Sequence, residues 1–251
     1  MDKPQKELMK SYFRNRELAA QQSNSTLLSY ETKYLIDSGE IDIKNLTEDD
    51  IYYFLMDYPD YFDKIAAVNN FDEMDYYIQT QLAMKHPQLI NKFNWKRKWK
   101  GMSSEKKEAE LIAKYPEAID LFDLSEYMGD DIATIVVAHP EMAERFEKDI
   151  KGERDGYISW RSDDISKILD VRPDLKDWFK YGYMDGAERL KLLYYHPEVI
   201  ENLFALYRED QMRKVYYADV KKDYKNKEDI NFDDLIKKHP QLEKYFEYMW
   251  K

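Results

Sequence analysis

Seven prolines recur in one sequence context, and they constrain the fold of this chain more than any other feature. They are Pro59, Pro87, Pro116, Pro140, Pro173, Pro197 and Pro240; the eighth proline, Pro4, lies outside the pattern. The residues four and five positions before each of the seven are apolar, and those two and six positions after are apolar or aromatic. Internal repetition of this kind is typical of helical arrays.

The chemistry of proline predicts a helix boundary at each of these sites. Proline disfavours the α conformation in the residue before it, so a helix should end there. Its missing N–H is harmless at the first position of a new helix, and the acid or amide that follows each proline suits the positive end of the helix dipole. Each repeat is therefore predicted to be a helix, a sharp break and a second helix.

Three repeats also carry signals for the start of the first helix. Thr47, Gly129 and Ser162 each stand before acidic residues and an isoleucine that lies eight positions before the proline. We expect these segments to cap helices, and this role also explains the recurring carboxylate pairs such as Asp130-Asp131 better than paired acid catalysis does. One helix pair cannot bury its apolar face alone, so neighbouring pairs should stack.

The sequence therefore predicts an all-α protein, a right-handed or irregular α-solenoid of about seven helix–turn–helix repeats. The repeat domain should span residues 46–251, after an N-terminal helical cap over residues 1–45. In the cap we expect helices near residues 5–22 and 27–38, with Gly39 as a stop. Residues 147–161 should form a loop, and residues 205–229 an extra or lengthened helix.

This pattern resembles degenerate α-helical repeats, namely HEAT-like repeats and the proline-marked repeats of mitochondrial transcription termination factors. The resemblance covers about residues 46–251. Resemblance to the termination factors implies a basic groove for duplex nucleic acid, which suits this chain poorly because its net charge is −11. Resemblance to HEAT-like arrays implies scaffolding or partner binding, which the composition permits.

The chain shows no motif for catalysis, for a cofactor or for a metal, so an enzyme is not expected. It has no cysteine, which fits a reducing cytoplasm. All four histidines occupy the position just before a proline, where Tyr58, Tyr115 and Arg172 stand in the other repeats. This exchange favours a structural role at the helix junction over metal binding, since metal ligands must converge on one ion.

One basic segment interrupts the acidic chain, and its candidate partner-binding residues are Trp95, Lys96, Arg97, Lys98, Trp99 and Lys100. Basic and aromatic residues together can hold phosphates and stack bases, or lie on an anionic membrane surface. Alternatively, the segment is a solvated loop with Trp95 and Trp99 anchored in the core, or it pairs with the acidic face of another copy.

The function predicted from these features is a non-enzymatic protein–protein interaction or scaffold role, with another protein as partner and self-association included. The alternatives are nucleic-acid binding through residues 92–107 and an acidic inhibitor that mimics DNA. The abundance of Tyr, Lys, Asn and Asp indicates an AT-rich genome. One hypothesis is therefore a phage-encoded structural or accessory protein, in the host cytoplasm or the virion.

Overall fold

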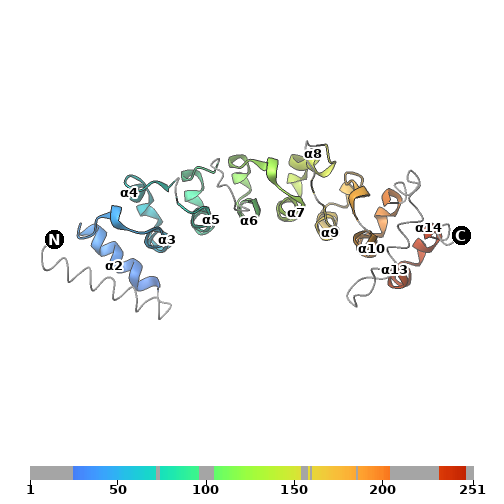
Figure 1. Ribbon diagram of the computed structural model, residues 1–251, viewed down its shortest axis with the longest axis horizontal. Helices are drawn as coiled ribbons and strands as arrows, with labels where there is room; N and C mark the ends of the chain where they lie inside the picture. Colours follow the sequence, from blue (N-terminus) through green and yellow to red (C-terminus); the bar gives the residue numbers. More distant parts are fainter. Residues whose placement is uncertain are drawn as a thin grey trace. The chain divides into compact units, whose positions relative to one another are not determined.

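The computed structural model describes residues 25–71, 74–95, 105–153, 158, 160–184, 186–203 and 232–246. All regular structure within these ranges is helical, with no strand, which confirms the predicted all-α class. None of the described helices is long and apolar enough to cross a membrane. The chain divides into two compact units, Met1–Asp123 and Leu124–Lys251, called the first and second unit below (Figure 1).

The first helices of six repeats have the same length of ten residues, and each ends two residues before its proline. They are α3 (Glu48–Asp57), α5 (Tyr76–Lys85), α6 (Glu105–Lys114), α7 (Gly129–Ala138), α9 (Ser162–Val171) and α10 (Gly186–Tyr195). The seventh, α13 (Phe232–Lys238), ends at the same distance from Pro240. The seven prolines thus mark the helix ends as predicted.

The residue immediately before the proline, called the junction residue below, has the same backbone conformation in all seven repeats. Its φ lies between −137° and −126° and its ψ between 66° and 83°. Its N–H still donates to the carbonyl four residues earlier, at 2.7–2.8 Å. The junction residue therefore completes the first helix and then turns the chain, as the steric demand of proline requires.

The second helix of each repeat begins as a 3-10 helix, which is tighter than an α-helix. The prolines open the 3-10 helices η2 (Pro59–Tyr61), η4 (Pro87–Lys92), η5 (Pro116–Leu121), η7 (Pro140–Phe146), η8 (Pro173–Asp177), η10 (Pro197–Val199) and η11 (Pro240–Leu242). Within the described residues four of them continue into α-helix, namely α4 (Phe62–Ala66), α8 (Glu147–Ile150), α14 (Glu243–Phe246) and residues 200–203. Because so short a segment forms few propagating hydrogen bonds, it adopts the i→i+3 pattern, in which the N–H two residues after the proline bonds the junction carbonyl.

Successive first helices pack against one another within each unit. In the first unit α2 (Ser25–Asp37) contacts α3, α3 contacts α5, and α5 contacts α6 (Figure 1). In the second unit α7 contacts α9, α9 contacts α10, and α10 contacts α13. The apolar pair before each proline is buried in this packing, apart from the half-buried Ile236. The residue six positions after the proline is also buried in the six repeats where its side chain is described.

The N-terminal cap and the insertions are described in part. Helix α2 matches the helix expected near residues 27–38, and Gly39 ends it with a positive φ of 72°. Short 3-10 helices η1 (Ile43–Asn45), η6 (Leu124–Glu126) and η9 (Tyr181–Tyr183) lie between repeats. Within residues 147–161, α8 comes first and Gly152 turns the chain with a φ of 61°. The helices predicted near residues 5–22 and 205–229 lie outside the described residues.

Helix starts follow the predicted chemistry at Thr47 but not at Ser162. The Thr47 side chain accepts the N–H of Asp50, whose carboxylate accepts the Thr47 N–H at 3.1 Å. This reciprocal pair satisfies two N–H groups that a helix start leaves unpaired. Ser162 instead is the first residue of α9, and its N–H donates to Glu188 Oε2 of α10 at 2.5 Å. A neighbouring repeat therefore supplies the cap that the serine was expected to provide.

Candidate interaction surface and repeat junctions

The junction residue of one repeat reaches back to the preceding repeat. His86 Nε2 lies 2.8 Å from the carbonyl oxygen of Met56, and His239 Nε2 lies 2.8 Å from that of Tyr194. Tyr115 donates its hydroxyl proton to the carbonyl of Met84 at 3.0 Å. All three accepting carbonyls occupy the same position, three residues before the proline of the preceding repeat.

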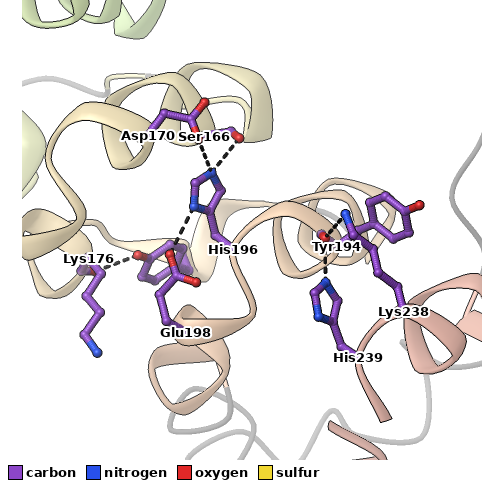
Figure 2. Close-up of polar contacts among 9 residues, drawn as sticks. Ser166, Asp170, Lys176, Tyr194, His196, Glu198, Lys238 and His239 are labelled. Carbon is purple, nitrogen blue, oxygen red and sulfur yellow. Dashed lines mark hydrogen bonds and ion pairs between the residues drawn. The ribbon is translucent and has the colours of Figure 1, made fainter. Parts of the chain in front are cut away.

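This position needs an outside donor because a helix end leaves its last carbonyls without partners. In an unbroken helix the N–H four residues onward would bond the carbonyl, but the proline turns the chain away. Lysines two residues before the proline add a second donor at the same carbonyls. Lys114 Nζ donates to Met84 at 2.7 Å and Lys238 Nζ to Tyr194 at 3.0 Å. Figure 2 shows Lys238 and His239 converging on Tyr194.

His196 joins α9 to α10 through side chains rather than through a carbonyl. Its Nε2 lies 2.8 Å from Ser166 Oγ and 3.6 Å from Asp170 Oδ1, while its Nδ1 lies 3.0 Å from Glu198 Oε1 (Figure 2). The imidazole is buried, so these partners replace the water that it would otherwise bond. The junction residue thus links neighbouring repeats here too.

Arg172 is the junction residue of its own repeat and reaches the preceding repeat through its guanidinium group. Its Nη1 donates to the carbonyl of Pro140 at 2.8 Å, and its Nη2 lies 3.1 Å from Glu144 and 2.8 Å from Asp174. Hydrogen bonding to Arg172 lowers the pKa of both carboxyl groups. Both carboxylates are exposed to water, so these ion pairs add little stability. The structural role of Arg172 comes from its hydrogen bond to the partly buried carbonyl of Pro140.

These contacts support a structural role for the histidines before proline. Within the described residues, no group of three His, Asp or Glu side chains is placed to hold a metal ion. His86, His196 and His239 each bond to the repeat before their own. Imidazole and phenol donate to the carbonyl three residues before the preceding proline, whereas Arg172 donates to the carbonyl of Pro140 itself.

A second set of equivalent contacts links the proline-initiated segments. The residue five positions after the proline contacts the residue four positions after the preceding proline. Lys92 Nζ lies 2.8 Å from Asp63, Asn202 Nδ2 donates to Asp177 at 2.8 Å, and the Tyr245 hydroxyl donates to Glu201 at 2.5 Å. Because the same positions meet in three places, neighbouring repeats share one register within each unit.

The junction geometry predicts which substitutions His86 tolerates. His86→Leu removes the donor to Met56 and should destabilise the first unit by about 1–2 kcal/mol, the cost of an unsatisfied, partly buried carbonyl. His86→Tyr should cost less than about half of that, because Tyr115 makes the same bond from the same position. Urea unfolding followed by circular dichroism measures both, and equal losses for Leu and Tyr would contradict the role assigned to this bond.

Large apolar side chains are exposed mainly along the first helices of the repeats. They are Tyr30 and Tyr34 on α2, Tyr53 on α3, Tyr77 on α5, Val137 on α7, Val171 on α9 and Tyr195 on α10. Two others, Val68 and Met128, lie in connections, and none lies on a described proline-initiated helix. Within each unit taken by itself, we call the exposed side of these helices, α2 included, the first-helix face of that unit. It has the composition of an interaction surface.

The basic segment begins at the core of the first unit. Trp95 is 5% exposed, and its Nε1–H donates to the carbonyl of Ile90 at 2.7 Å. Its ring lies 5.1–5.6 Å from the rings of Tyr76, Phe93 and Phe122. Trp95 is therefore a packing residue, as the alternative interpretation of this segment held. Lys96, Arg97, Lys98, Trp99 and Lys100 lie outside the described residues, so partner contact by them stays a prediction.

The sequence reasoning missed a buried polar pair in the first unit. The Tyr76 hydroxyl donates to Glu108 Oε1 at 2.5 Å, and burial raises the pKa of Tyr76. Glu108 lies eight residues before Pro116, where other repeats carry Ile51, Ile132 and Ile165. The glutamate in a position that is apolar in other repeats is the sequence feature that could have indicated a buried polar contact. Gln79 occupies the same position one repeat earlier and donates to two buried carbonyls.

Comparison with known proteins adds no assignment: no family model, no curated protein and no solved structure matches this chain.

Proposed function

We propose that this chain is a non-enzymatic α-solenoid of about seven repeats that binds a protein partner and acts as an interaction scaffold. The solenoid is supported by the seven equivalent junctions and by the periodic contacts between neighbouring repeats within each unit. At three junctions a side chain of one repeat completes the helix end of the repeat before it. An array of this kind exposes an extended surface on which a partner can lie.

The observation that carries the proposal is the unequal distribution of exposed apolar residues. Tyrosines and valines gather on the first-helix face, whereas the described proline-initiated helices expose none. Exposed apolar residues that gather on one set of helices are typical of a binding surface. Tyrosine in particular is enriched at protein interfaces.

Site-specific photocrosslinking tests this proposal. A photoreactive phenylalanine analogue at Tyr53, Tyr77 or Tyr195 should crosslink the full chain to one defined protein in an extract of its native source. The same analogue at exposed positions of the proline-initiated helices, Asp60 and Glu117, is the matched control and should not. Crosslinks from both sets of sites, or from neither, would contradict a binding role for the first-helix face.

The same protein distinguishes the nucleic-acid alternative. If residues 92–107 hold phosphates, single- or double-stranded nucleic acid should bind at low salt, and the affinity should fall steeply as salt rises. The proposed scaffold role predicts no such binding. Lys92, the one basic residue of this segment before Trp95, is already paired with Asp63.

A further inference from the structure

Four exposed tyrosines lie on three successive helices of the first unit, and we call them the tyrosine surface. Tyr30, Tyr34, Tyr53 and Tyr77 are 66%, 62%, 52% and 54% exposed. They come from α2, α3 and α5, which pack in succession. On one helix, Tyr30 and Tyr34 are four residues apart and so share a side.

Helix packing places these tyrosines on neighbouring helices. Ser29 donates its hydroxyl proton to the carbonyl of Tyr53 at 3.3 Å, which places the turn of α2 that holds Tyr30 against α3. Tyr77 lies on α5, which packs against the other side of α3 in the succession.

Carboxylates surround the tyrosine surface. Asp49 and Asp57 lie four residues before and four residues after Tyr53, so all three share one side of α3, and both acids are exposed. The described residues 25–71 and 74–95 contain eleven acids and five lysines. Four of those lysines already lie within 4.0 Å of a carboxylate: Lys33, Lys64, Lys85 and Lys92. The surface is therefore aromatic and acidic, with few cations of its own.

Lysine and tyrosine already pair elsewhere in this fold. Lys238 Nζ lies 3.8 Å from the ring centroid of Tyr194, Lys114 Nζ lies 5.2 Å from that of Tyr115, and Lys33 Nζ lies 5.4 Å from that of Tyr61. Among the described residues, no cation lies over the rings of the tyrosine surface. Aromatic faces attract cations through their quadrupole. The faces of these rings are therefore available to a cationic group of a binding partner.

We propose that the tyrosine surface binds a lysine- or arginine-rich segment of the partner protein, with cationic side chains over Tyr53 and Tyr77 and beside Asp49. Asp57 already lies 3.6 Å from Lys85 Nζ and is not counted as a contact. This inference rests on the proposed function and names the chemistry of its partner. A basic segment satisfies the rings and the carboxylates together. An apolar helix would instead strip water from the carboxylates without returning a charge, which is costly.

Binding of a fluorescein-labelled heptalysine peptide to the full chain, followed by fluorescence anisotropy at low salt, tests the proposal. The double variant Y53A/Y77A should bind about three- to tenfold more weakly, because two exposed cation–π contacts are lost. The double variant Y53F/Y77F should stay within about twofold of the native chain, because the rings remain. Asp49→Asn should also weaken binding, and more so at low salt than at high salt.

Val68→Ala is the matched control, because Val68 is an apolar residue of the same unit that is 41% exposed but lies in a connection, outside the first-helix face. It should leave the affinity unchanged. An equal loss with Val68→Ala, no loss with Y53A/Y77A, or equal binding of a heptaglutamine peptide would overturn the inference. If heptalysine fails to bind while photocrosslinks from the first-helix face persist, the partner chemistry is wrong and the scaffold role stands.

Discussion

Replacing Trp95 by alanine should destabilise the first unit by about 3–5 kcal/mol, the range found when a buried tryptophan is removed. The indole is almost fully enclosed and contacts Phe93 and Phe122, so its loss leaves a cavity. It also leaves the carbonyl of Ile90 without its donor. Guanidinium chloride unfolding followed by circular dichroism measures the loss. Hydrogen exchange of the α5 amides shows whether it falls on the first unit.

Trp95→Phe is the matched variant, because it keeps an aromatic ring but removes the N–H. It should cost about 1–2 kcal/mol, which covers the lost hydrogen bond and the smaller ring. Exchange rates of the α9 amides, in the second unit, provide the internal reference. A Trp95→Ala protein as stable as the native chain would remove Trp95 from the core. Partner contact would then again be the better interpretation of this residue.

Phe146→Ala should cost the second unit about 3–5 kcal/mol, for a related reason at a different position of the repeat. Phe146 lies six residues after Pro140 at the end of η7, and its side chain is fully buried. The size of the loss reports how much the proline-initiated segments contribute to the core. The same denaturant titration, with hydrogen exchange at α7 and α9, gives the measurement.

Val137→Ala is the comparison for Phe146→Ala, because Val137 belongs to the same repeat but is exposed on α7. Its loss should stay within about 0.5 kcal/mol, as for most surface substitutions. Similar losses at the two positions would show that the short 3-10 segments do not help to enclose the interior.

The prolines made much of the fold predictable because each one acts locally. Pro87 restricts only His86, so the end of α5 could be inferred without knowing any other part of the chain. The apolar pair Leu82-Ala83 was likewise assigned to the core from spacing alone, and it is fully buried. The 3-10 geometry of the following segment depends on how few residues remain before the next turn, which spacing does not reveal.

Contacts between repeats were not predictable, because they depend on the register of stacked helices. Tyr115 and its acceptor Met84 are 31 residues apart, and Tyr76 and Glu108 are 32 apart. Only the packing of α5 against α6 brings each pair together. The position of Ser162 shows the same limit, since a favoured capping residue lost that role to a carboxylate from the following repeat.

The junction residue has a consequence for how such a chain can change over time. What the preceding carbonyl requires is one proton donor at the correct reach, and imidazole, phenol and ammonium groups all meet that need here. We expect substitutions among them to cost less than loss of the donor, so the sequences of the repeats can diverge while the fold is kept. In a family of such proteins, the regular placement of prolines would therefore remain detectable after sequence similarity between the prolines had been lost.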